Sequence, residues 1–412
     1  MESALIEFQN VTKRFNGRTV LDKVNLKINE GDVTTIIGKS GTGKSVLLKH
    51  IIGLLYPTEG RILFRGKPVD EMSKREWTAY KSQFSYLFQN NALFDSLTVY
   101  ENIALPLQQT TNLRKKEIEQ RVMARVEQLD LLEATHKYPS ELSGGMEKRV
   151  ALARALITDP KIVLFDEPTT GQDPIRKNAI LSMIAQNQRR FGFTTVMISH
   201  DIPDVFFISD RIMILYDGRM IFQDTYDQLD RLEHPIVDEF VKSLEGFKDE
   251  LTGLHSRRNF KRYEQDLSQK EPHEAYIVLI FTLENIEGLS ENVGHKAVPE
   301  VVQSLGTYIN KHFGDVGIST RLGRDRIATI LPSTDINDAE RMLEDFSKDL
   351  LAKGLTHIQA DTRLDPNSED CFSFSILAGL AEGRAGEDMD VTTEKAISNQ
   401  KPILQFACDI RR

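Results

Sequence analysis

The sequence has few of the features that mark a secreted or membrane-spanning chain. Only two of its 412 residues are cysteines, Cys371 and Cys408, and two thiols do not make a disulfide framework. No apolar run approaches the ~20 residues that a membrane-spanning helix needs. Met1–Ala4 contains no basic region followed by an apolar one, so we expect no signal peptide. We therefore expect a reducing, cytoplasmic setting, and another protein must hold the chain if it works at a membrane.

An excess of basic residues is also missing. The formal net charge is -9 at pH 7, whereas a nucleic-acid-binding face usually adds basic residues, so we expect no nucleic-acid partner. The length predicts two or three domains, and the 40% hydrophobic content is enough for packed cores. No Gly/Ser-rich or Pro-rich spacer occurs near Gly246, where we place the main boundary between residues 1–246 and 247–412.

The most informative stretch present is Gly38–Ser45, which fits the phosphate-binding pattern G-x-x-x-x-G-K-[ST]. An apolar run, Val33–Ile37, precedes it and predicts a strand. Leucines and isoleucines recur at helical spacing after it, up to Ile52. The context is therefore strand, glycine-rich turn and helix, which disfavours the alternative of an ordinary glycine-rich turn.

This loop predicts a site for the phosphates of ATP. Its glycines let successive backbone N–H groups turn toward phosphate oxygens, and the helix N-terminus favours an anion. Lys44 is expected along the β- and γ-phosphates, and the Ser45 hydroxyl is expected to bind Mg²⁺. The predicted nucleotide-binding residues of the loop are Gly38, Lys39, Ser40, Gly41, Thr42, Gly43, Lys44 and Ser45.

Polar residues follow three further apolar strand candidates. Phe84–Phe88 ends at Gln89, Ile162–Phe165 is followed by Asp166 and Glu167, and Thr194–Ile198 leads to His200. Open α/β sheets bind ligands beyond the carboxyl ends of their strands, so these side chains are candidates for one site.

Each of these side chains has a predicted role. Gln89 is expected to bind Mg²⁺ and sense the γ-phosphate, and Asp166 to hold the metal through water. Glu167 is expected to polarise the attacking water, and His200 to contact the γ-phosphate. A solvated surface glutamine and a structural histidine are the alternatives for Gln89 and His200.

Three other features add to the candidate site. Phe15 lies ahead of the phosphate loop, where an aromatic ring can stack on adenine; a core phenylalanine is the alternative. Ser143, Gly144 and Gly145 precede a helix and make a second candidate anion site. Asp173 lies in the turn that follows Glu167.

Taken together, these motifs closely resemble the ATPase subunit of ABC transporters over about residues 4–246. The resemblance implies an α/β fold with a mixed core sheet, an antiparallel edge sheet and a helical subdomain. Each motif occurs once, and in that family the signature motif of one subunit completes the ATP site of another. Ser143, Gly144 and Gly145 are therefore expected to act in trans, together with Asp173, in a head-to-tail homodimer.

A narrower resemblance is to the MlaF/Mkl-type ATPases, carried by Ala92–Ala104, by Met146 and by Asp166–Pro174. It implies ATP hydrolysis that energises phospholipid transport between bacterial membranes, with the chain peripheral on the cytoplasmic face of the inner membrane. The implied partners are an MlaE-like integral-membrane permease, contacted by Gln89–Leu107, an MCE substrate-binding protein and a small STAS-like subunit. In the turn that contains Asp173, this sequence has Gln172 where the family usually has leucine. The alternatives are the ATPase of another ABC importer and, more distantly, an ABC protein without a transport role.

The second half contains the segment Asp249–Phe260, Asp-Glu-Leu-Thr-Gly-Leu-His-Ser-Arg-Arg-Asn-Phe. This segment resembles the entry motif of GGDEF domains, which make cyclic di-GMP from two GTP, and the resemblance covers roughly residues 247–412. Ala275–Leu283 predicts a strand, and the spacing of apolar residues predicts helices around Val298–Ile309 and Ala339–Leu350. The second domain is therefore expected to be a GGDEF-like α/β domain.

The catalytic residues of that family are not conserved in this half. The GG[DE]EF motif stands here as Gly323–Ile327, with the cation Arg326 in place of a metal-binding carboxylate and Arg324 in place of a glycine. Three other expected polar ligands are replaced by Thr282, Ser290 and Pro299. We predict no diguanylate cyclase activity and a regulatory or scaffolding role. The alternative is a domain that binds a guanine nucleotide and regulates the ATPase, with the arginines as an anion site or only a solvated loop.

Overall fold

The computed structural model describes residues 4–87, 92–200, 202, 204–231, 248–268, 275–293, 295–354, 373–384 and 387–407. The chain divides into two compact units. Unit 1 comprises Met1–Gln172 and Met183–Asp238, and unit 2 comprises Asp173–Ser182 and Glu239–Arg412. The division cuts one continuous helix, α6 (Pro174–Phe191). The boundary predicted at Gly246 lies outside the described residues and stays a prediction.

Unit 1 contains an antiparallel sheet with the strand order β2-β1-β4-β5. Its strands are β1 (Ile6–Phe15), β2 (Arg18–Ile28), β4 (Glu59–Phe64) and β5 (Lys67–Pro68). In β2, buried Leu21, Val24, Leu26 and Ile28 are separated by more exposed residues, as expected of strands with one face on a core. The predicted antiparallel edge sheet is confirmed.

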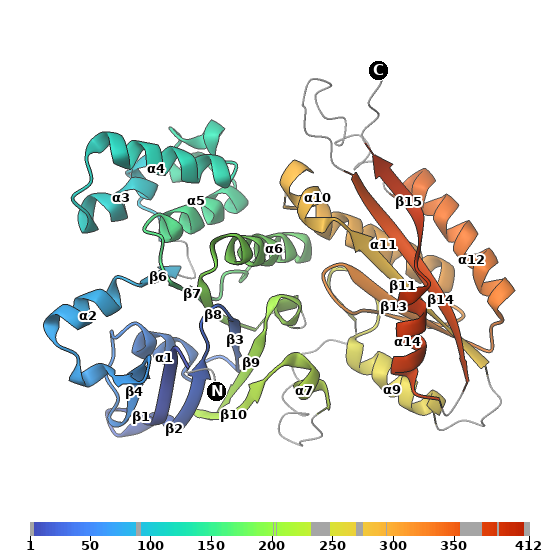
Figure 1. The fold of residues 1–412 in the computed structure, drawn as a ribbon, viewed down its shortest axis with the longest axis horizontal. Helices are drawn as coiled ribbons and strands as arrows, with labels where there is room; N and C mark the ends of the chain where they lie inside the picture. The colour runs from blue at the N-terminus through green and yellow to red at the C-terminus, as the bar shows by residue number, and fades with distance from the viewer. Residues whose placement is uncertain are drawn as a thin grey trace. The chain divides into compact units, whose positions relative to one another are not determined.

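A second, six-stranded sheet forms the centre of unit 1, in the order β10-β9-β3-β8-β7-β6 (Figure 1). The strands are β3 (Val33–Ile37), β6 (Phe84–Leu87), β7 (Ile162–Asp166), β8 (Thr194–Ser199), β9 (Arg211–Tyr216) and β10 (Arg219–Asp224). Neighbours from β9 to β6 run parallel, and only β10 is antiparallel. Every residue of β3 and β8 is buried, which is why these segments lack polar alternation. The mixed core sheet is therefore as predicted.

The helices of unit 1 include a group in which α3 packs on both α4 and α5, which matches the predicted helical subdomain (Figure 1). The α-helices are α1 (Lys44–Ile51), α2 (Lys74–Lys81), α3 (Val99–Thr110), α4 (Lys115–Gln128), α5 (Gly144–Leu156) and α7 (Tyr226–Arg231). Short 3₁₀ turns are η1 (Val69–Glu71), η2 (Leu132–Ala134), η3 (Pro139–Glu141) and η4 (Asp204–Ile208). Helix α3 begins with a capping box of Thr98 and Glu101, which satisfies the first backbone N–H groups.

Unit 2 contains a five-stranded antiparallel sheet in the order β12-β13-β11-β14-β15. Its strands are β11 (Ala275–Glu284), β12 (Ile318–Arg321), β13 (Arg326–Pro332), β14 (Ser373–Arg384) and β15 (Lys401–Ala407). Its helical segments are α9 (Arg257–Ser268), α10 (Ile286–Val293), α11 (Ala297–Phe313), α12 (Ile336–Asp349), the π-helical turn η5 (Leu350–Gly354) and α14 (Met389–Ser398).

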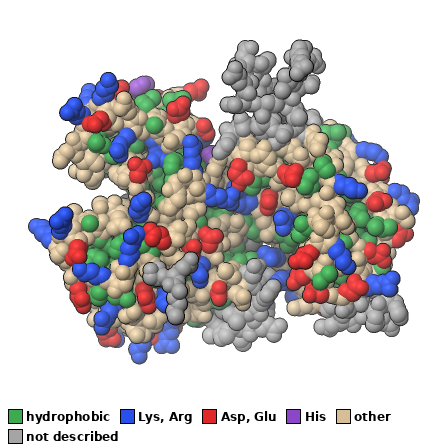
Figure 2. Space-filling view, in the orientation of Figure 1, with side chains coloured by type: hydrophobic (Ala, Val, Ile, Leu, Met, Phe, Trp, Pro, Cys, Tyr) green, Lys and Arg blue, Asp and Glu red, His purple; other side chains and the backbone are tan. Residues whose placement is uncertain are grey.

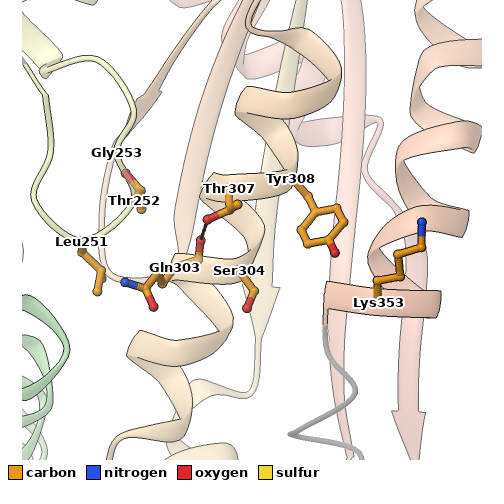
Figure 3. Close-up of a pocket in the computed structure, with 8 residues that line it drawn as sticks. All are labelled: Leu251, Thr252, Gly253, Gln303, Ser304, Thr307, Tyr308 and Lys353. Carbon is orange, nitrogen blue, oxygen red and sulfur yellow. Dashed lines mark hydrogen bonds between the residues drawn. The ribbon is translucent and has the colours of Figure 1, made fainter.

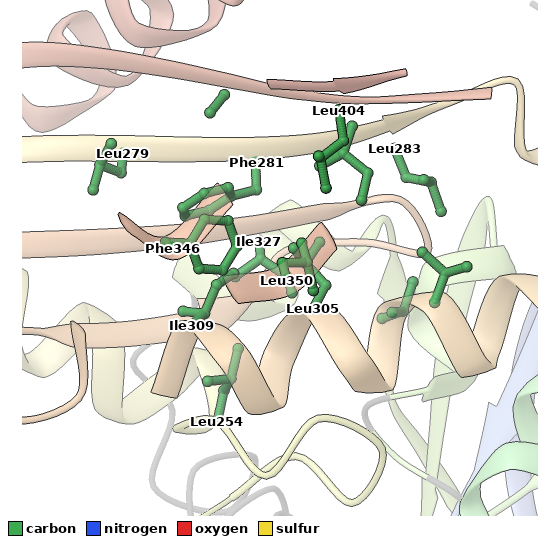
Figure 4. Packing of buried hydrophobic residues seen from close by; sticks show 14 of the residues in the cluster. Leu254, Leu279, Phe281, Leu283, Leu305, Ile309, Ile327, Phe346, Leu350 and Leu404 are labelled. Atoms are coloured by element: carbon green, nitrogen blue, oxygen red, sulfur yellow. The ribbon is translucent and has the colours of Figure 1, made fainter. Parts of the chain in front are cut away.

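Alternate residues of the central strand β11 enter two different cores. Phe281 and its odd-numbered neighbours pack with Leu305 of α11 and Phe346 of α12 (Figure 4). Tyr276, Val278 and Ile280 face the opposite side, where they pack with α9 and α14. A strand covered on both faces needs apolar residues throughout, which explains the unbroken run in the sequence.

The described surface carries charges of both signs. Figure 2 shows Lys and Arg interspersed with Asp and Glu on the visible face. Within the described ranges, we find no helix with the length and apolar character needed to cross a membrane.

Candidate nucleotide site

The phosphate loop joins β3 to α1 and has a backbone that requires glycine at two positions. Gly41 and Gly43 have φ values of 81° and 103°, in the left-handed region. A Cβ added at Gly43 would lie 3.0 Å from Leu21 Cδ2 and 3.1 Å from the Val20 oxygen. Gly43 is also the N-cap of α1 and has no side chain with which to cap it. The loop therefore leads into a helix N-terminus whose first N–H groups face no side-chain cap at that position.

Lys44 points back into this loop. Its Nζ donates to the carbonyl oxygens of Gly38 at 2.7 Å and Lys39 at 3.1 Å, and the residue is 6% exposed. Burial lowers the pKa of Lys44, while the negative charges of Glu167 and Asp166 oppose that shift. Because the ammonium group of Lys44 is buried, an anion bound in the loop would stabilise its charge.

Asp166 lies at the end of β7, with both carboxylate oxygens in hydrogen bonds. Ser45 Oγ donates to Oδ1 at 3.3 Å, and Tyr86 of β6 donates to Oδ2 at 2.6 Å. Burial and the bond to Asp166 raise the pKa of Tyr86, so the phenol remains a donor. Tyr86 was not predicted as a site residue, because only the parallel pairing of β6 with β7 places it beside Asp166.

Glu167 is held in an uncommon backbone conformation. Its φ is 51°, and its N–H donates to the Ile198 oxygen of β8 at 3.0 Å. The Thr170 hydroxyl donates to Oε2 at 3.2 Å, and His200 Nδ1 lies 3.6 Å from Oε1. Thr170 was also missed. The strained backbone at a carboxylate beside the phosphate loop is the pattern expected where geometry serves chemistry.

The signature residues occupy the N-terminus of α5. Ser143 is the N-cap, and its Oγ accepts from Met146 N at 3.4 Å. A Cβ added at Gly144 or at Gly145 would meet no heavy atom within 4 Å. Packing inside the described chain therefore does not require glycine at these two positions.

The remaining predicted residues lie as follows. Phe15, at the end of β1, is 41% exposed with Lys13 Nζ 5.1 Å above its ring, so the core alternative is wrong. Asp173 is at the start of α6, where Oδ1 accepts from Arg176 N at 3.0 Å. Gln89 lies outside the described residues. The structure therefore brings together five of the predicted residues, namely Lys44, Ser45, Asp166, Glu167 and His200. Among the described residues, the contacts given above do not join these five to Phe15, Ser143, Gly144, Gly145 or Asp173.

In unit 2, the hairpin between β12 and β13 places a cation where the GGDEF resemblance expects metal ligands. Arg326 pairs with Thr282 across β13 and β11, and the Thr282 hydroxyl accepts from Gln400 Nε2 at 2.7 Å. Among the described residues, no group of three or more His, Cys, Asp or Glu is arranged to hold a metal ion.

Unit 2 also has an open pocket of about 490 Å³, whose lining includes none of the hairpin residues (Figure 3). It is lined by Leu251, Thr252, Gly253, Gln303, Ser304, Thr307, Tyr308 and Lys353. Thr307 Oγ1 donates to the Gln303 oxygen at 2.9 Å, and Lys353 Nζ lies 3.2 Å from Asp349 Oδ1. Both polar groups are therefore already engaged within the fold.

Comparison with protein families finds two matches. Residues 21–170 match the family described as "ABC transporter", and residues 247–369 match "Diguanylate cyclase, GGDEF domain". The two predicted resemblances are confirmed at this level, one in each half of the chain.

Similar curated proteins match the first half. The chain is 40% identical over 242 residues to the "Intermembrane phospholipid transport system ATP-binding protein MlaF" of Haemophilus influenzae, covering 59% of this chain and 92% of that protein. It is 36% identical over 236 residues to the "Probable ribonucleotide transport ATP-binding protein mkl" of Mycobacterium leprae, covering 57% of this chain and 68% of that protein.

Solved structures agree on the fold of this region. The cbiO1 subunit of an ABC transporter complex from Clostridium perfringens aligns with a TM-score of 0.51 and 29% identity, over 58% of this chain and 100% of that one. A nucleotide-free ATP-binding cassette from an ABC transporter aligns with a TM-score of 0.50 and 28% identity, over 57% of this chain and 98% of that one.

Proposed function

This chain belongs to the ATP-binding proteins of ABC transporters, in the branch that includes MlaF, and from this we propose that its ATPase drives phospholipid movement between bacterial membranes. The observation that supports it most is the cluster of Lys44, Ser45, Asp166 and Glu167 beside the phosphate loop, in a chain 40% identical to a phospholipid-transport ATP-binding protein. ATP is the nucleotide that the family binds. The lipid cargo is carried over from the name of the relative.

The proposed catalytic roles follow from the positions of the side chains. Lys44 neutralises phosphate charge that the loop N–H groups also bind. Glu167, in contact with Thr170 and close to His200, orients and deprotonates the attacking water, and His200 contacts the γ-phosphate. Phe15 has the exposed ring needed to stack on adenine.

The same cluster suits Mg²⁺. A hydroxyl and a carboxylate, Ser45 Oγ and Asp166 Oδ1, lie 3.3 Å apart and are the hard oxygen donors that this ion prefers. When bound, Mg²⁺ would neutralise charge on the phosphates. Ser45 and Asp166 would hold it, with Gln89 as a further proposed ligand. Tyr86, which bonds the other oxygen of Asp166, would keep that carboxylate oriented.

We place the working site between two copies of the chain. Packing within the described chain does not require glycine at positions 144 and 145, so the space beside them is open. This open space at the N-terminus of α5 suits the close approach of a phosphate bound to a second subunit. Ser143 would then donate in trans, and Asp173 would lie in the dimer interface.

The proposed partners are an MlaE-like permease, an MCE substrate-binding protein and a small STAS-like subunit, with this chain peripheral on the cytoplasmic face of the inner membrane. The permease is proposed to contact residues 89–107. Within that segment Phe94 is 51% exposed, as a docking residue would be.

Affinity purification of the full chain from its native membranes tests the assignment. An integral-membrane permease should co-purify, and lipid exchange by the reconstituted complex should require ATP and stop with Glu167→Gln. Co-purification with an importer for another solute would favour the second candidate, since the mkl relative is named for ribonucleotide transport. If no permease co-purifies with the chain, both proposed transport functions are contradicted.

For unit 2 we propose a scaffolding or regulatory role without cyclase activity, since Arg326 stands beside Thr282 at the expected metal site. Calorimetry of the full-length Lys44→Ala variant with cyclic di-GMP and with GTP distinguishes the two roles. Micromolar binding would favour nucleotide-regulated ATPase activity; no binding would favour a scaffold. Formation of cyclic di-GMP from GTP would refute the prediction of inactivity.

A further inference from the structure

The first half of α6 is packed as part of unit 2. Residues Asp173–Ser182 belong to that unit, and Ile175 packs against its main hydrophobic core. Lys177 Nζ lies 3.2 Å from Glu250 Oε2. The helix then continues into unit 1 from Met183. The start of this helix, directly after Asp173, is therefore held by side chains that the ATPase motifs do not include.

Arg321, the last residue of β12, is at the centre of this attachment. It is 4% exposed, and the contacts of its guanidinium include two hydrogen bonds and a nearby carboxylate. Nη2 donates to Asn178 Oδ1 at 2.8 Å, Nε donates to the Gly323 oxygen at 2.9 Å, and Nη1 lies 3.7 Å from Asp249 Oδ2. Such a planar fork fixes the relative position of its partners better than a lysine would.

Asn178 connects Arg321 to the start of α6 by hydrogen bonds. It is 5% exposed, and while its Oδ1 accepts from Arg321, its Nδ2 donates to the Pro174 oxygen at 3.0 Å. Pro174 follows Asp173 directly. A hydrogen-bonded path therefore runs from Arg321 through Asn178 to the residue beside Asp173.

The path is not needed for apolar packing. A buried arginine and a buried asparagine cost desolvation, and apolar residues of similar size are often as stable at such positions. The hairpin glycine that a GGDEF enzyme would use at its own site is here Gly323, whose carbonyl oxygen holds Arg321. Stability alone therefore does not require this pair, whereas its hydrogen bonds do fix where Asn178 lies relative to β12.

We propose that Arg321 and Asn178 are positioning residues for ATP hydrolysis: they set the first turn of α6 and, through it, the Asp173 turn. The inference rests on the proposed function, in that it takes Asp173 to work at the ATP site.

The helix supplies its own control. Asn187, also on α6 and 4% exposed, makes the same i→i−4 bond to the Met183 oxygen at 2.8 Å, but lies in unit 1. In the full chain, Asn178→Ala should lower kcat about tenfold with KM for ATP changed less than about twofold, as expected for misplacement rather than lost binding. Asn187→Ala should change kcat less than about twofold at a matched loss of melting temperature. Equal effects of the two variants on kcat would overturn the proposal.

Variants of Arg321 complete the test. Arg321→Met combined with Asn178→Ala should be no slower than the slower single variant, because both break one path; additive losses would overturn the proposal. Arg321→Lys should recover part of kcat. If Arg321→Met does not fold, the Asn178 and Asn187 pair still decides. The Asp173→Ala variant distinguishes failure of the proposed function from failure of this inference. A normal kcat of Asp173→Ala would refute the role of Asp173 at the ATP site. A low kcat of Asp173→Ala together with a normal kcat of Asn178→Ala would refute only the positioning role.

Discussion

Replacing Glu167 with glutamine tests the assignment of the general base. The amide has the same shape, can accept from the Thr170 hydroxyl as Oε2 does at 3.2 Å, and keeps the backbone bond to the Ile198 oxygen. Glutamine has no more difficulty than glutamate at a φ of 51°, so the fold should be unchanged. The substitution therefore removes only the ability of the side chain to take a proton from water.

The expected loss of turnover is roughly 10²–10⁴-fold, the range for losing a general base. At ~1.36 kcal/mol per factor of ten, this corresponds to about 3–5 kcal/mol added to the barrier. Affinity for ATP should not fall, because Lys44 and the loop remain. ATP binding without hydrolysis should also accumulate the head-to-tail dimer.

Phosphate release at saturating ATP and size-exclusion chromatography with ATP measure the two effects. Glu30→Gln is the matched control, since Glu30 is an exposed carboxylate paired with Arg65 at 2.7 Å and lies outside the motifs. Near-normal turnover of Glu167→Gln would refute the role of Glu167. An ATP-loaded variant that stays monomeric would refute the shared site.

Three further predictions concern the ATPase unit. Lys44→Ala should abolish tight ATP binding in calorimetry, whereas Lys49→Ala, on the exposed side of the same helix, should not; unchanged affinity of Lys44→Ala would contradict the site. Gly145→Ala should not lower stability toward urea, since the added methyl meets no heavy atom within 4 Å, yet it should lower turnover because the methyl enters the partner's site; full activity would count against the dimer. Because burial lowers the pKa of Lys44 and the charged form binds phosphate, ATP affinity should fall as pH rises toward that pKa, and binding there should take up a proton; calorimetry in two buffers of different ionisation enthalpy measures the uptake, and none at any pH up to 10 would contradict the assignment.

Part of this site could be read directly from the sequence. The loop Gly38–Ser45 depends on local geometry, since Gly41 and Gly43 need left-handed backbone and Lys44 returns to carbonyls a few residues away. Asp166 and Glu167 come at the end of a wholly apolar segment, and a buried strand with carboxylates at its end is a local pattern as well.

Tyr86 and Thr170 could not be found in this way. Tyr86 is 80 positions from Asp166, and only the pairing of β6 with β7 brings the phenol to the carboxylate. Thr170 contacts Glu167 because of how the turn folds after β7, and many residues at that spacing would be surface hydroxyls.

The sequence by itself determined the chemistry of the ATPase half and the loss of metal ligands in the GGDEF-like half, because each depends on residue types at fixed, short spacing. The tertiary structure alone decided which unit holds the start of α6. The contact of Arg321 with Asn178 joins residues 143 positions apart, and Asn178 looks in the sequence like any polar helix residue. Its partner is set by long-range packing, which no local pattern encodes.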